Sequence, residues 1–326
     1  MIYEKFLSTL DRKLEYVFSD KKLKPTELYE PQNYILSLGG KRIRPLLALI
    51  ASDLFGSDYK KAMPAALCVE LFHNFSLIHD DILDKAPLRR GKQTVHKKWN
   101  TNIAILSGDA MLVRSYIELN KAETKFRDSL NKIFSKTAIE VCEGQQDDMN
   151  FETSNSVSVQ QYKEMITKKT AILLACSLQM GAVCANAKEK EARLIYNCGK
   201  HLGIAFQIKD DLLDAFGDQN KFGKQVGGDI ISNKKTFLLL KALELANTKQ
   251  NKELKNWISL KKFNKKAKVN SIIRIFDEIG IRELTQKEID LHFKTAITTF
   301  NKIESIEFSK KEIFINFCVE LMNREK

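Results

Sequence analysis

The chain has 326 residues, of which 44% are hydrophobic and 29% charged, so it is long enough to bury a substantial core. Its 53 basic and 41 acidic side chains give a formal net charge of +12, which is compatible with nucleic acid, an anionic membrane or a phosphorylated substrate. With only five prolines and 14 glycines, a sandwich or barrel full of tight turns is disfavoured and long helices are favoured.

No Gly/Ser/Pro-rich linker interrupts the sequence, so we expect one domain over residues 1–326. Much of the excess charge lies in lysine-rich stretches such as Lys261 to Lys268, which are best interpreted as solvated surface. The six cysteines show no CxxC spacing and mostly have apolar neighbours, which indicates buried free thiols in a reducing compartment.

The N-terminus shows no targeting signal. An acidic residue comes early in Met1 to Lys5, and no apolar run of the signal-peptide kind follows. The most apolar stretch, Ala171 to Ala185, is shorter than a bilayer requires and contains Ser177 and Gln179. We therefore expect a cytoplasmic chain without a transmembrane segment.

Helical spacing of apolar residues begins near the N-terminus, where residues 3–18 are predicted to form an amphipathic helix. Pro31 is expected to open a short second helix, because proline favours the first helical turn. Gly39 and Gly40 are expected to end it, since glycine is favoured just after a helix C-terminus.

Three cations, Lys41, Arg42 and Arg44, follow the glycines at the start of a helix predicted over residues 46–54. Backbone N–H groups at a helix start lack partners, so these cations would make an anion site there. The alternative is an ordinary exposed turn, where basic residues are common.

A long and almost wholly apolar helix is predicted over residues 60–84, and we expect it to be central. Its end carries Asp80, Asp81 and Asp84, which fall within an arc of about 100° and so face one way. Two carboxylates ~4 Å apart repel by about 4 kcal/mol at an effective dielectric of ~20, and a hard cation such as Mg²⁺ would relieve this. The alternative is a solvated acidic patch.

His73, two turns earlier, would face the same way and is either a satisfied core residue or a hydrogen-bond donor to a phosphate.

The same acidic spacing recurs at Asp210, Asp211 and Asp214, at the end of a helix predicted over residues 189–216. One acidic triplet is a weak signal, whereas two matched copies strongly indicate a paired metal site; the interval between them is too long for a repeat array. No convincing strand pattern occurs. Further helices are predicted over residues 102–119, 130–148, 159–185 and 234–246, with shorter ones to the C-terminus.

Several motifs occur in one order along the chain, and together they resemble the trans-isoprenyl diphosphate synthases, also called polyprenyl synthetases. The longer ones are GGKRIRP from Gly39, HNFSLIHDDILD from His73, RRGKQTVH from Arg89 and FQIKDDLLD from Phe206. The shorter ones are Gly108-Asp109, GQQDD from Gly144, Lys169-Thr170, Gly223-Lys224 and Lys234. The resemblance implies an all-α isoprenoid synthase fold, with long antiparallel helices around a deep central cavity. It also implies a homodimer and two aspartate motifs that face each other across the cavity mouth.

The reaction implied by the resemblance joins isopentenyl diphosphate to an allylic diphosphate, which would be dimethylallyl, geranyl or farnesyl diphosphate. The allylic diphosphate ionises, the double bond of isopentenyl diphosphate attacks the carbocation, and loss of a proton leaves a chain longer by one isoprene unit. About three Mg²⁺ ions per active site would neutralise the departing diphosphate. Asp80, Asp84 and Asp210 would ligate them directly, with Asp81, Asp211 and Asp214 supporting directly or through water.

The resemblance also assigns the substrate sites. The allylic diphosphate would be held by Arg89, Lys169, Lys224 and Lys234. Isopentenyl diphosphate would be held without metal by Lys41, Arg44, His73 and Arg90. Gln207, with Thr170 and Gln145, could offer oxygen dipoles to the cation; for Thr170 and Gln145 a helix–helix hydrogen bond is the alternative.

Product length in this family depends on the cavity before the first aspartate motif. Phe75, five residues before Asp80, would form a floor that stops the growing chain, with the small Ser76 beside it. This predicts farnesyl or geranylgeranyl diphosphate rather than a long quinone tail. The alternative is that Phe75 is only a core residue.

Other functions stay open. A longer-chain polyprenyl synthase would share all the motifs. A terpene cyclase shares the first aspartate motif, but GGKRIRP and the second motif argue against it. A non-catalytic partner subunit would be expected to have lost one motif, and both are intact. A nucleic-acid-binding protein would explain the positive charge, yet the chain has no known reader motif, so we expect no nucleic-acid partner.

Overall fold

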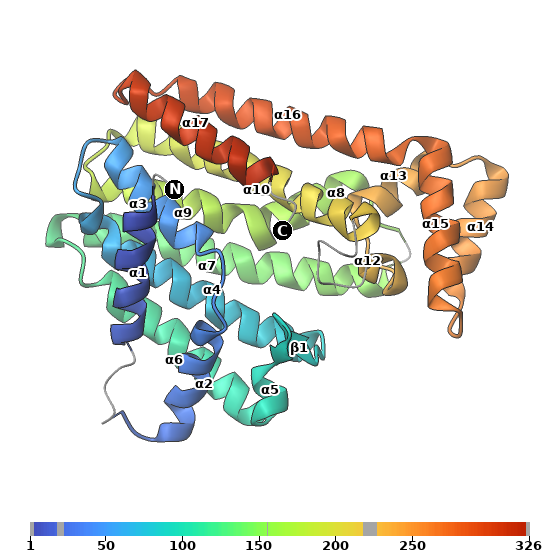
Figure 1. Cartoon of the computed structure of the whole chain (residues 1–326), viewed down its shortest axis with the longest axis horizontal. Coiled ribbons are helices and arrows are strands. Elements are labelled where there is room, and N and C mark those ends of the chain that lie inside the picture. The colour runs from blue at the N-terminus through green and yellow to red at the C-terminus, as the bar shows by residue number, and fades with distance from the viewer. Residues whose placement is uncertain (1–2, 18–22, 155, 218–226, 324–326) are drawn as a thin grey trace. The chain divides into compact units, whose positions relative to one another are not determined.

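The computed structural model describes residues 3–17, 23–154, 156–217 and 227–323, and most of these residues are helical (Figure 1). They form two compact units, one within residues 1–136 and 176–193 and the other within residues 137–175 and 194–326. The unit boundaries fall within α7 (Thr124–Thr153), α9 (Ile172–Cys184) and α10 (Glu189–Phe216). The predicted all-α class is confirmed. None of the helices in these ranges combines the length and apolarity that crossing a membrane requires.

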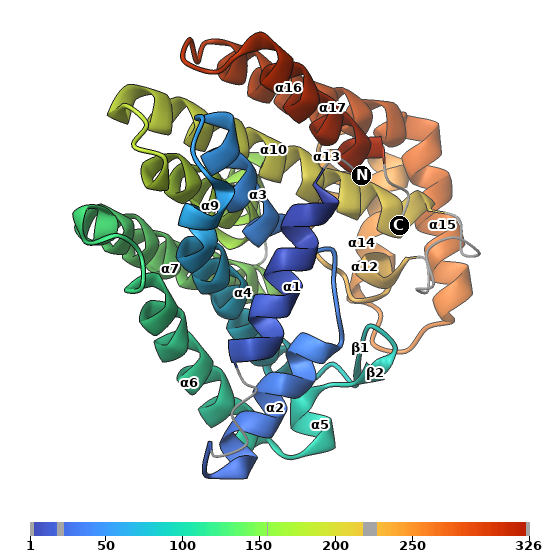
Figure 2. The same ribbon diagram turned by 60° about the vertical axis from the view of Figure 1, so that its left-hand side comes forward.

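Helix α4 (Met63–Leu83) is the central element of the first unit, and it packs along α6 (Thr101–Leu119) and against α3 (Ile43–Leu54) (Figure 2). Most of its side chains are buried, as expected for a helix with so little polar surface. Other elements in contact with it include α1 (Glu4–Val17), α2 (Thr26–Ser37), the 3-10 turn η1 (Tyr59–Ala62) and α5 (Val95–Lys98).

Helix α2 begins at Thr26, so the prediction that Pro31 opens it is wrong; Pro31 is buried inside the helix. An earlier proline, Pro25, occupies the position before the helix, and the residues after it favour helix formation. The predicted ending is confirmed, because Gly39 and Gly40 follow the helix with φ values of 77° and 141°.

A small hairpin follows α4, although no strand was predicted. β1 (Leu88–Arg89) pairs antiparallel with β2 (Lys92–Gln93), and strands of two residues are too short to show an alternating pattern. Arg90 and Gly91 form the turn with φ values of 51° and 74°, as a tight primed hairpin turn requires. The hairpin thereby fixes the arginine pair of the RRGK motif.

The core of the second unit is formed by α10 with α8 (Val159–Ile166), α13 (Phe237–Leu245), α15 (Lys265–Ile279) and α16 (Ile281–Asn301). The predicted helix over residues 159–185 is interrupted by a π-helical turn, η2 (Thr167–Ala171). Three further helices each add a side chain to this core: α12 (Gly228–Ile231), α14 (Thr248–Ser259) and α17 (Phe308–Asn323). Helices α12 and α14 contact α15, and α17 packs on α16 through Phe314 and Phe300.

The six cysteines are free thiols. Five of them are buried, as predicted, whereas Cys142 is exposed on α7.

Candidate active site

The first aspartate motif lies at the C-terminal end of α4, and the protein itself binds its middle residue. Asp81 is only 1% exposed. Arg89 donates from Nε to Oδ2 and from Nη2 to Oδ1 of Asp81, each at 2.8 Å. A bidentate ion pair of this kind is strong and geometrically specific. In this structure Asp81 and Arg89 therefore bind each other, while their roles toward metal and diphosphate stay predictions.

The outer residues of the first motif, Asp80 and Asp84, are more exposed than Asp81. They are four residues apart, so their side chains lie on the same face of α4, one turn from each other. Asp84 ends the helix, with its backbone N–H bonded to the carbonyl of Asp80 at 2.8 Å. This placement suits two carboxylates that share a cation.

Positive charge surrounds His73 on α4. Arg44 of α3 donates from Nη1 to Nε2 of His73 at 3.2 Å, since arginine can only donate. Burial and the charges of Arg44, Arg89, Arg90 and Arg42 lower the pKa of His73 well below its usual value, so the imidazole is neutral at pH 7. Arg89 and Arg42 are paired with the carboxylates of Asp81 and Glu70, and the excess of cations over carboxylates favours an anion.

The GGKRIRP segment is held by Arg42, one of the three cations that were predicted to form an anion site; its guanidinium is paired with a carboxylate instead. Arg42 has a left-handed backbone (φ 49°), and its guanidinium Nη1 donates to Glu70 Oε1 at 2.5 Å. Gly40 lies against Arg90, because a Cβ at Gly40 would be 2.7 Å from Arg90 Nη2. Arg42 thus anchors the turn, and the exposed Lys41 precedes it.

The predicted chain-length floor lies within an aromatic cluster. Phe75 is 9% exposed, and its ring centroid is 5.5 Å from that of Phe72 and 4.7 Å from that of His79. The hydroxyl of the half-buried Ser76 donates to the carbonyl of His73 at 2.9 Å. Phe75 is therefore well packed, and its effect on product length stays a prediction.

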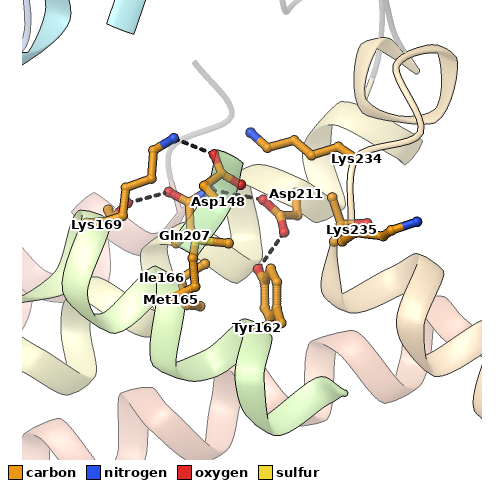
Figure 3. Close-up of a pocket in the computed structure, with 11 residues that line it drawn as sticks. Asp148, Tyr162, Met165, Ile166, Lys169, Gln207, Asp211, Lys234 and Lys235 are labelled. Carbon is orange, nitrogen blue, oxygen red and sulfur yellow. Dashed lines mark hydrogen bonds and ion pairs between the residues drawn. The ribbon is translucent and has the colours of Figure 1, made fainter. Parts of the chain in front are cut away.

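The second aspartate motif, on α10, repeats the arrangement of the first. Its middle residue, Asp211, is 5% exposed. The hydroxyl of Tyr162 donates to Asp211 Oδ2 at 2.5 Å, and Gln207 Nε2 donates to Oδ1 at 2.9 Å (Figure 3). The outer residues, Asp210 and Asp214, are again more exposed. In both motifs the fold binds the central carboxylate.

The carboxylates of the second motif lie in an environment that opposes their ionisation. Burial, followed by the charge of Asp229, raises the pKa of Asp211 to about 7 and that of Asp214 to about 6. Asp214 Oδ2 also accepts a hydrogen bond from the backbone N–H of Asp229 at 2.9 Å, which ties α10 to α12. A bound cation would favour the ionised form of these groups.

The π-helical turn η2 determines where Lys169 lies. Lys169 Nζ binds Asp148 Oδ2 on α7 at 2.5 Å (Figure 3). Gly144 of α7 permits this approach, because a Cβ there would be 2.3 Å from the backbone N of Lys169. π-Helical turns interrupt the regular hydrogen bonding of a helix and are frequent at functional sites.

A pocket in the second unit brings five predicted residues together: Lys169, Thr170, Gln207, Asp211 and Lys234. Figure 3 shows the side chain of Lys234 extending over the pocket on the side of Asp148 and Asp211, whereas Lys235 points away. Apolar side chains of α8 also line the pocket. The pocket is therefore one in which cations and oxygen ligands converge beside apolar surface.

Three further predicted residues have separate outcomes. The hydroxyl of Thr170 donates to Gln207 Oε1 at 3.1 Å, so the helix–helix hydrogen bond considered as an alternative is present. Gln145 Oε1 is buried and has no hydrogen-bond partner among the residues that the structure describes. Lys224 lies outside the described residues, and its role stays a prediction.

Sequence reasoning missed two residues of this site. Tyr162 lies 49 residues before its partner Asp211 in an ordinary amphipathic helix, so nothing local marks it. Asp148 belongs to the GQQDD motif, but no role was assigned to it. Both the GQQDD motif and the Lys169-Thr170 motif were recognised in the sequence. An ion pair between the acidic residue of one and the lysine of the other is the role that could have been predicted from them.

The donors available fit Mg²⁺. No group of three or more metal-ligating side chains is already assembled in the described part of the chain. Mg²⁺ commonly binds one or two carboxylates and completes its shell with water and substrate phosphates. The outer aspartates of each motif supply such hard oxygen donors, and the carboxylates with raised pKa values would gain from a cation.

Comparisons with known proteins agree with one another. Residues 25–276 match the family model described as polyprenyl synthetase. A short chain isoprenyl diphosphate synthase of Methanocaldococcus jannaschii is 41% identical over 257 residues, 78% of this chain and 77% of that protein. A geranylgeranyl diphosphate synthase of Sulfolobus acidocaldarius is 37% identical over 285 residues, 86% of this chain and 85% of that protein. The crystal structure of a geranylgeranyl pyrophosphate synthase matches with a TM-score of 0.94 and 44% identity, covering 99% of both chains.

Proposed function

Because the chain belongs to the polyprenyl synthetase family, it is an isoprenyl diphosphate synthase, and we propose that it makes a short-chain trans-prenyl diphosphate, geranylgeranyl or farnesyl diphosphate. Its proposed substrates are isopentenyl diphosphate and dimethylallyl, geranyl or farnesyl diphosphate. The names of the relatives support the short chain. The observation that carries the proposal is the matched construction of the two aspartate motifs, each with a protein-bound central carboxylate and more exposed outer ones.

The chain as a whole is proposed to be one polyprenyl synthetase domain. The family match over residues 25–276 supports this, since it includes residues of both compact units.

The six aspartates are proposed to have different roles in metal binding. Asp80, Asp84 and Asp210 are the direct ligands, and Asp214 assists. Asp81 and Asp211, whose oxygens are engaged by protein donors, support the geometry indirectly. When bound, about three Mg²⁺ ions would neutralise the charge that develops on the departing diphosphate.

Lys169 and Lys234 are the proposed ligands of the allylic diphosphate on the second unit, together with Lys224. The first two line one pocket, which supports a shared role. The ion pair with Asp148 keeps the ammonium of Lys169 oriented before substrate binds. Arg89 is the further ligand proposed from the sequence, and it is paired with Asp81.

Isopentenyl diphosphate is proposed to bind Lys41, Arg44, His73 and Arg90. Its site needs no metal, because the arginines around the neutral His73 already supply positive charge. Arginine suits this task because its fork of donors matches two phosphate oxygens.

Gln207 and Thr170 are proposed to face the carbocation with oxygen dipoles. Thr170 donates to Oε1 of Gln207, and Nε2 of Gln207 donates to Asp211, so the two hydrogen bonds fix the orientation of the amide. A fixed dipole stabilises developing charge without having to reorganise during the reaction.

A homodimer is also proposed. Leu106, Val113 and Ile117 are exposed on α6, and their spacing places them on one face of that helix. An apolar stripe of this kind on a surface helix is typical of a face that packs against another helix.

The test of the function is an assay with Mg²⁺, radiolabelled isopentenyl diphosphate and each short allylic primer in turn, followed by product chromatography. Asp80→Ala and Asp210→Ala should each lower turnover by at least about a hundredfold. Their circular dichroism should be unchanged, and the exposed Asp128→Ala serves as the matched control. Substantial activity in either variant would overturn the paired metal site. Turnover of an allylic diphosphate alone to a hydrocarbon or alcohol would indicate a cyclase instead.

A further inference from the structure

Lys268 of α15 is a fully buried lysine at the edge of the second unit's core, although its neighbours in sequence suggested a solvated surface. Its ammonium donates to Asn233 Oδ1 at 2.5 Å and to the carbonyl of Ile231 at 3.3 Å. It also lies 4.3 Å from the ring centroid of Phe263. Within the described part of the chain these contacts are all to neutral groups, and burying an ammonium without a carboxylate is costly. Burial accordingly lowers the pKa of Lys268.

Asn233, the acceptor for Lys268, lies in a left-handed turn directly before Lys234. Its backbone is left-handed (φ 58°), a conformation that asparagine adopts more readily than most residues other than glycine. Its amide Nδ2 donates to the carbonyl of Ile258 on α14 at 3.1 Å, while its Oδ1 accepts from Lys268 on α15. The Asn233 side chain therefore connects the turn to both α14 and α15 by hydrogen bonds.

Lys234 continues from this turn into the pocket. Its backbone N–H donates to the carbonyl of Asp229 at 2.9 Å, and its own carbonyl accepts from the N–H of Thr236 at 2.9 Å. Thr236 then caps α13 with its hydroxyl. Lys234 lies over the pocket beside Asp211 (Figure 3), and Thr236 lines the same pocket. The direction of the Lys234 side chain thus depends on a short segment with Asn233 at its start.

Val269, the neighbour of Lys268 on α15, contacts the start of the segment that leads to Asn233. Gly227 has a φ of 82°, and a Cβ there would lie 2.8 Å from Cγ2 of Val269. Two residues later, the backbone of Asp229 binds the carboxylate of Asp214. Helix α15 therefore contacts the segment over residues 227–233 at both of its ends.

We propose that Lys268 is a positioning residue, which acts through Asn233 to hold the turn that directs the ammonium of Lys234 over the pocket. The inference rests on the proposed function only for the identity of the ligand, the allylic diphosphate. An apolar side chain of similar length would fill the space of Lys268 but would leave Asn233 Oδ1 without its donor.

The first test is Lys268→Met, which keeps the length and removes the charge and the donor. Catalytic efficiency with the allylic diphosphate should fall by up to about a hundredfold, as for a misplaced substrate-binding group. The KM for isopentenyl diphosphate should stay unchanged, and Tm should hold or rise because a buried charge is gone. Lys266→Met, at an exposed position on the same helix, is the matched control. Equal losses for both substrates, or a lowered Tm with unchanged kinetics, would overturn the proposal.

A double-mutant cycle with Lys234→Ala tests whether Lys268 affects catalysis through Lys234. If Lys268 acts through Lys234, Lys268→Met should cause no further loss in the Lys234→Ala background. Losses that multiply would show that Lys268 acts by another path and would overturn the proposal.

Hydrogen exchange separates this inference from the proposed function. In the full-length chain, Lys268→Met should accelerate backbone exchange in a peptide covering residues 229–236 and leave peptides of α16 unchanged. The exchange rates test the positioning role without any measurement of activity. A wild-type chain without prenyltransferase activity would overturn the proposed function but not the positioning role. If Lys268→Met does not fold, Asn233→Gly provides the same comparison, because it keeps the left-handed backbone and removes the acceptor. Unchanged exchange would overturn the proposal.

Discussion

Arg89 donates to both carboxylate oxygens of Asp81, at 2.8 Å each, from a hairpin that immediately follows the helix bearing the aspartate. On the second unit, Tyr162 and Gln207 donate to the two oxygens of Asp211 in the same way. Adjacent carboxylates of one acidic motif therefore differ in their surroundings. The central one is bound by the protein, and the outer ones are more exposed.

The difference predicts separable effects on stability and activity. Asp81→Ala should lower the free energy of unfolding by about 2 kcal/mol, because it leaves the Arg89 guanidinium without its partner. Asp84→Ala, at an exposed position, should change it by less than about 0.5 kcal/mol while abolishing condensation. Urea denaturation and the prenyltransferase assay measure the two effects. Equal losses of stability in both variants would contradict the division of roles.

The sequence predicted the repeated motif and the helix over residues 189–216, because period, spacing and composition are local properties. It could not show which aspartate of each triplet is buried, since Arg89 and Tyr162 come from other elements. The π turn was equally hidden, because its close contact with Gly144 involves a residue of a different helix. The burial of Lys268 could not be predicted either. The lysine-rich composition of its stretch indicated a solvated surface, whereas tertiary packing buries its side chain.

Gly144 provides a test of how Lys169 is placed. Gly144→Ala would put a Cβ 2.3 Å from the backbone N of Lys169, so either α7 or the π turn must move. We expect a loss of about 1–3 kcal/mol in the free energy of unfolding, as for an overpacked site, and weaker binding of the allylic diphosphate. Thermal unfolding and KM measure these effects, with Gln146→Ala on the exposed side of the same helix as control. Wild-type KM in Gly144→Ala would refute the proposed link.

Phe75 is the proposed determinant of product length. Phe75→Ala should lengthen the product, because it removes the ring that would stop the growing chain. The same change should cost about 3–5 kcal/mol of stability, as for a buried aromatic residue, so Phe75→Leu is the milder companion variant. Product chromatography measures the length, and the exposed Phe308→Ala should leave it unchanged. A product of unchanged length in a folded Phe75→Ala would leave Phe75 as a core residue only.

The exposed stripe of α6 predicts the behaviour of the oligomer. Replacing Leu106 and Ile117 by serine should shift sedimentation from dimer towards monomer, because it removes apolar area from the proposed interface. Leu291→Ser, at an exposed position on α16, is the control and should not change sedimentation. If the wild-type chain sediments as a monomer, or the α6 variant stays a dimer, the stripe is not the dimer interface.

A histidine pair in the second unit predicts how stability depends on pH. His201 Nδ1 on α10 and His292 Nδ1 on α16 are 2.9 Å apart, so one ring must donate and the other must accept. The acceptor ring must be neutral. Glu288 Oε1 lies 3.3 Å from His292 Nε2 and also forms an ion pair with Lys163, and Lys200 contributes further positive charge.

Burial, the charge of His292 and Lys200 lower the pKa of His201 to about 4 from 6.5, and burial lowers the pKa of His292 as well. Because the folded pKa values lie below the unfolded one, the unfolded chain binds protons first as pH falls. Stability from the pair is therefore fully present above about pH 6.5 and is lost progressively towards about pH 4. Between these pH values, the free energy of unfolding measured in urea should depend less on pH in the His201→Gln, His292→Gln double variant than in the wild-type chain. Groups that titrate elsewhere contribute equally to both proteins and so cancel in the comparison. Identical pH dependence in both proteins would show that the pair does not titrate with folding.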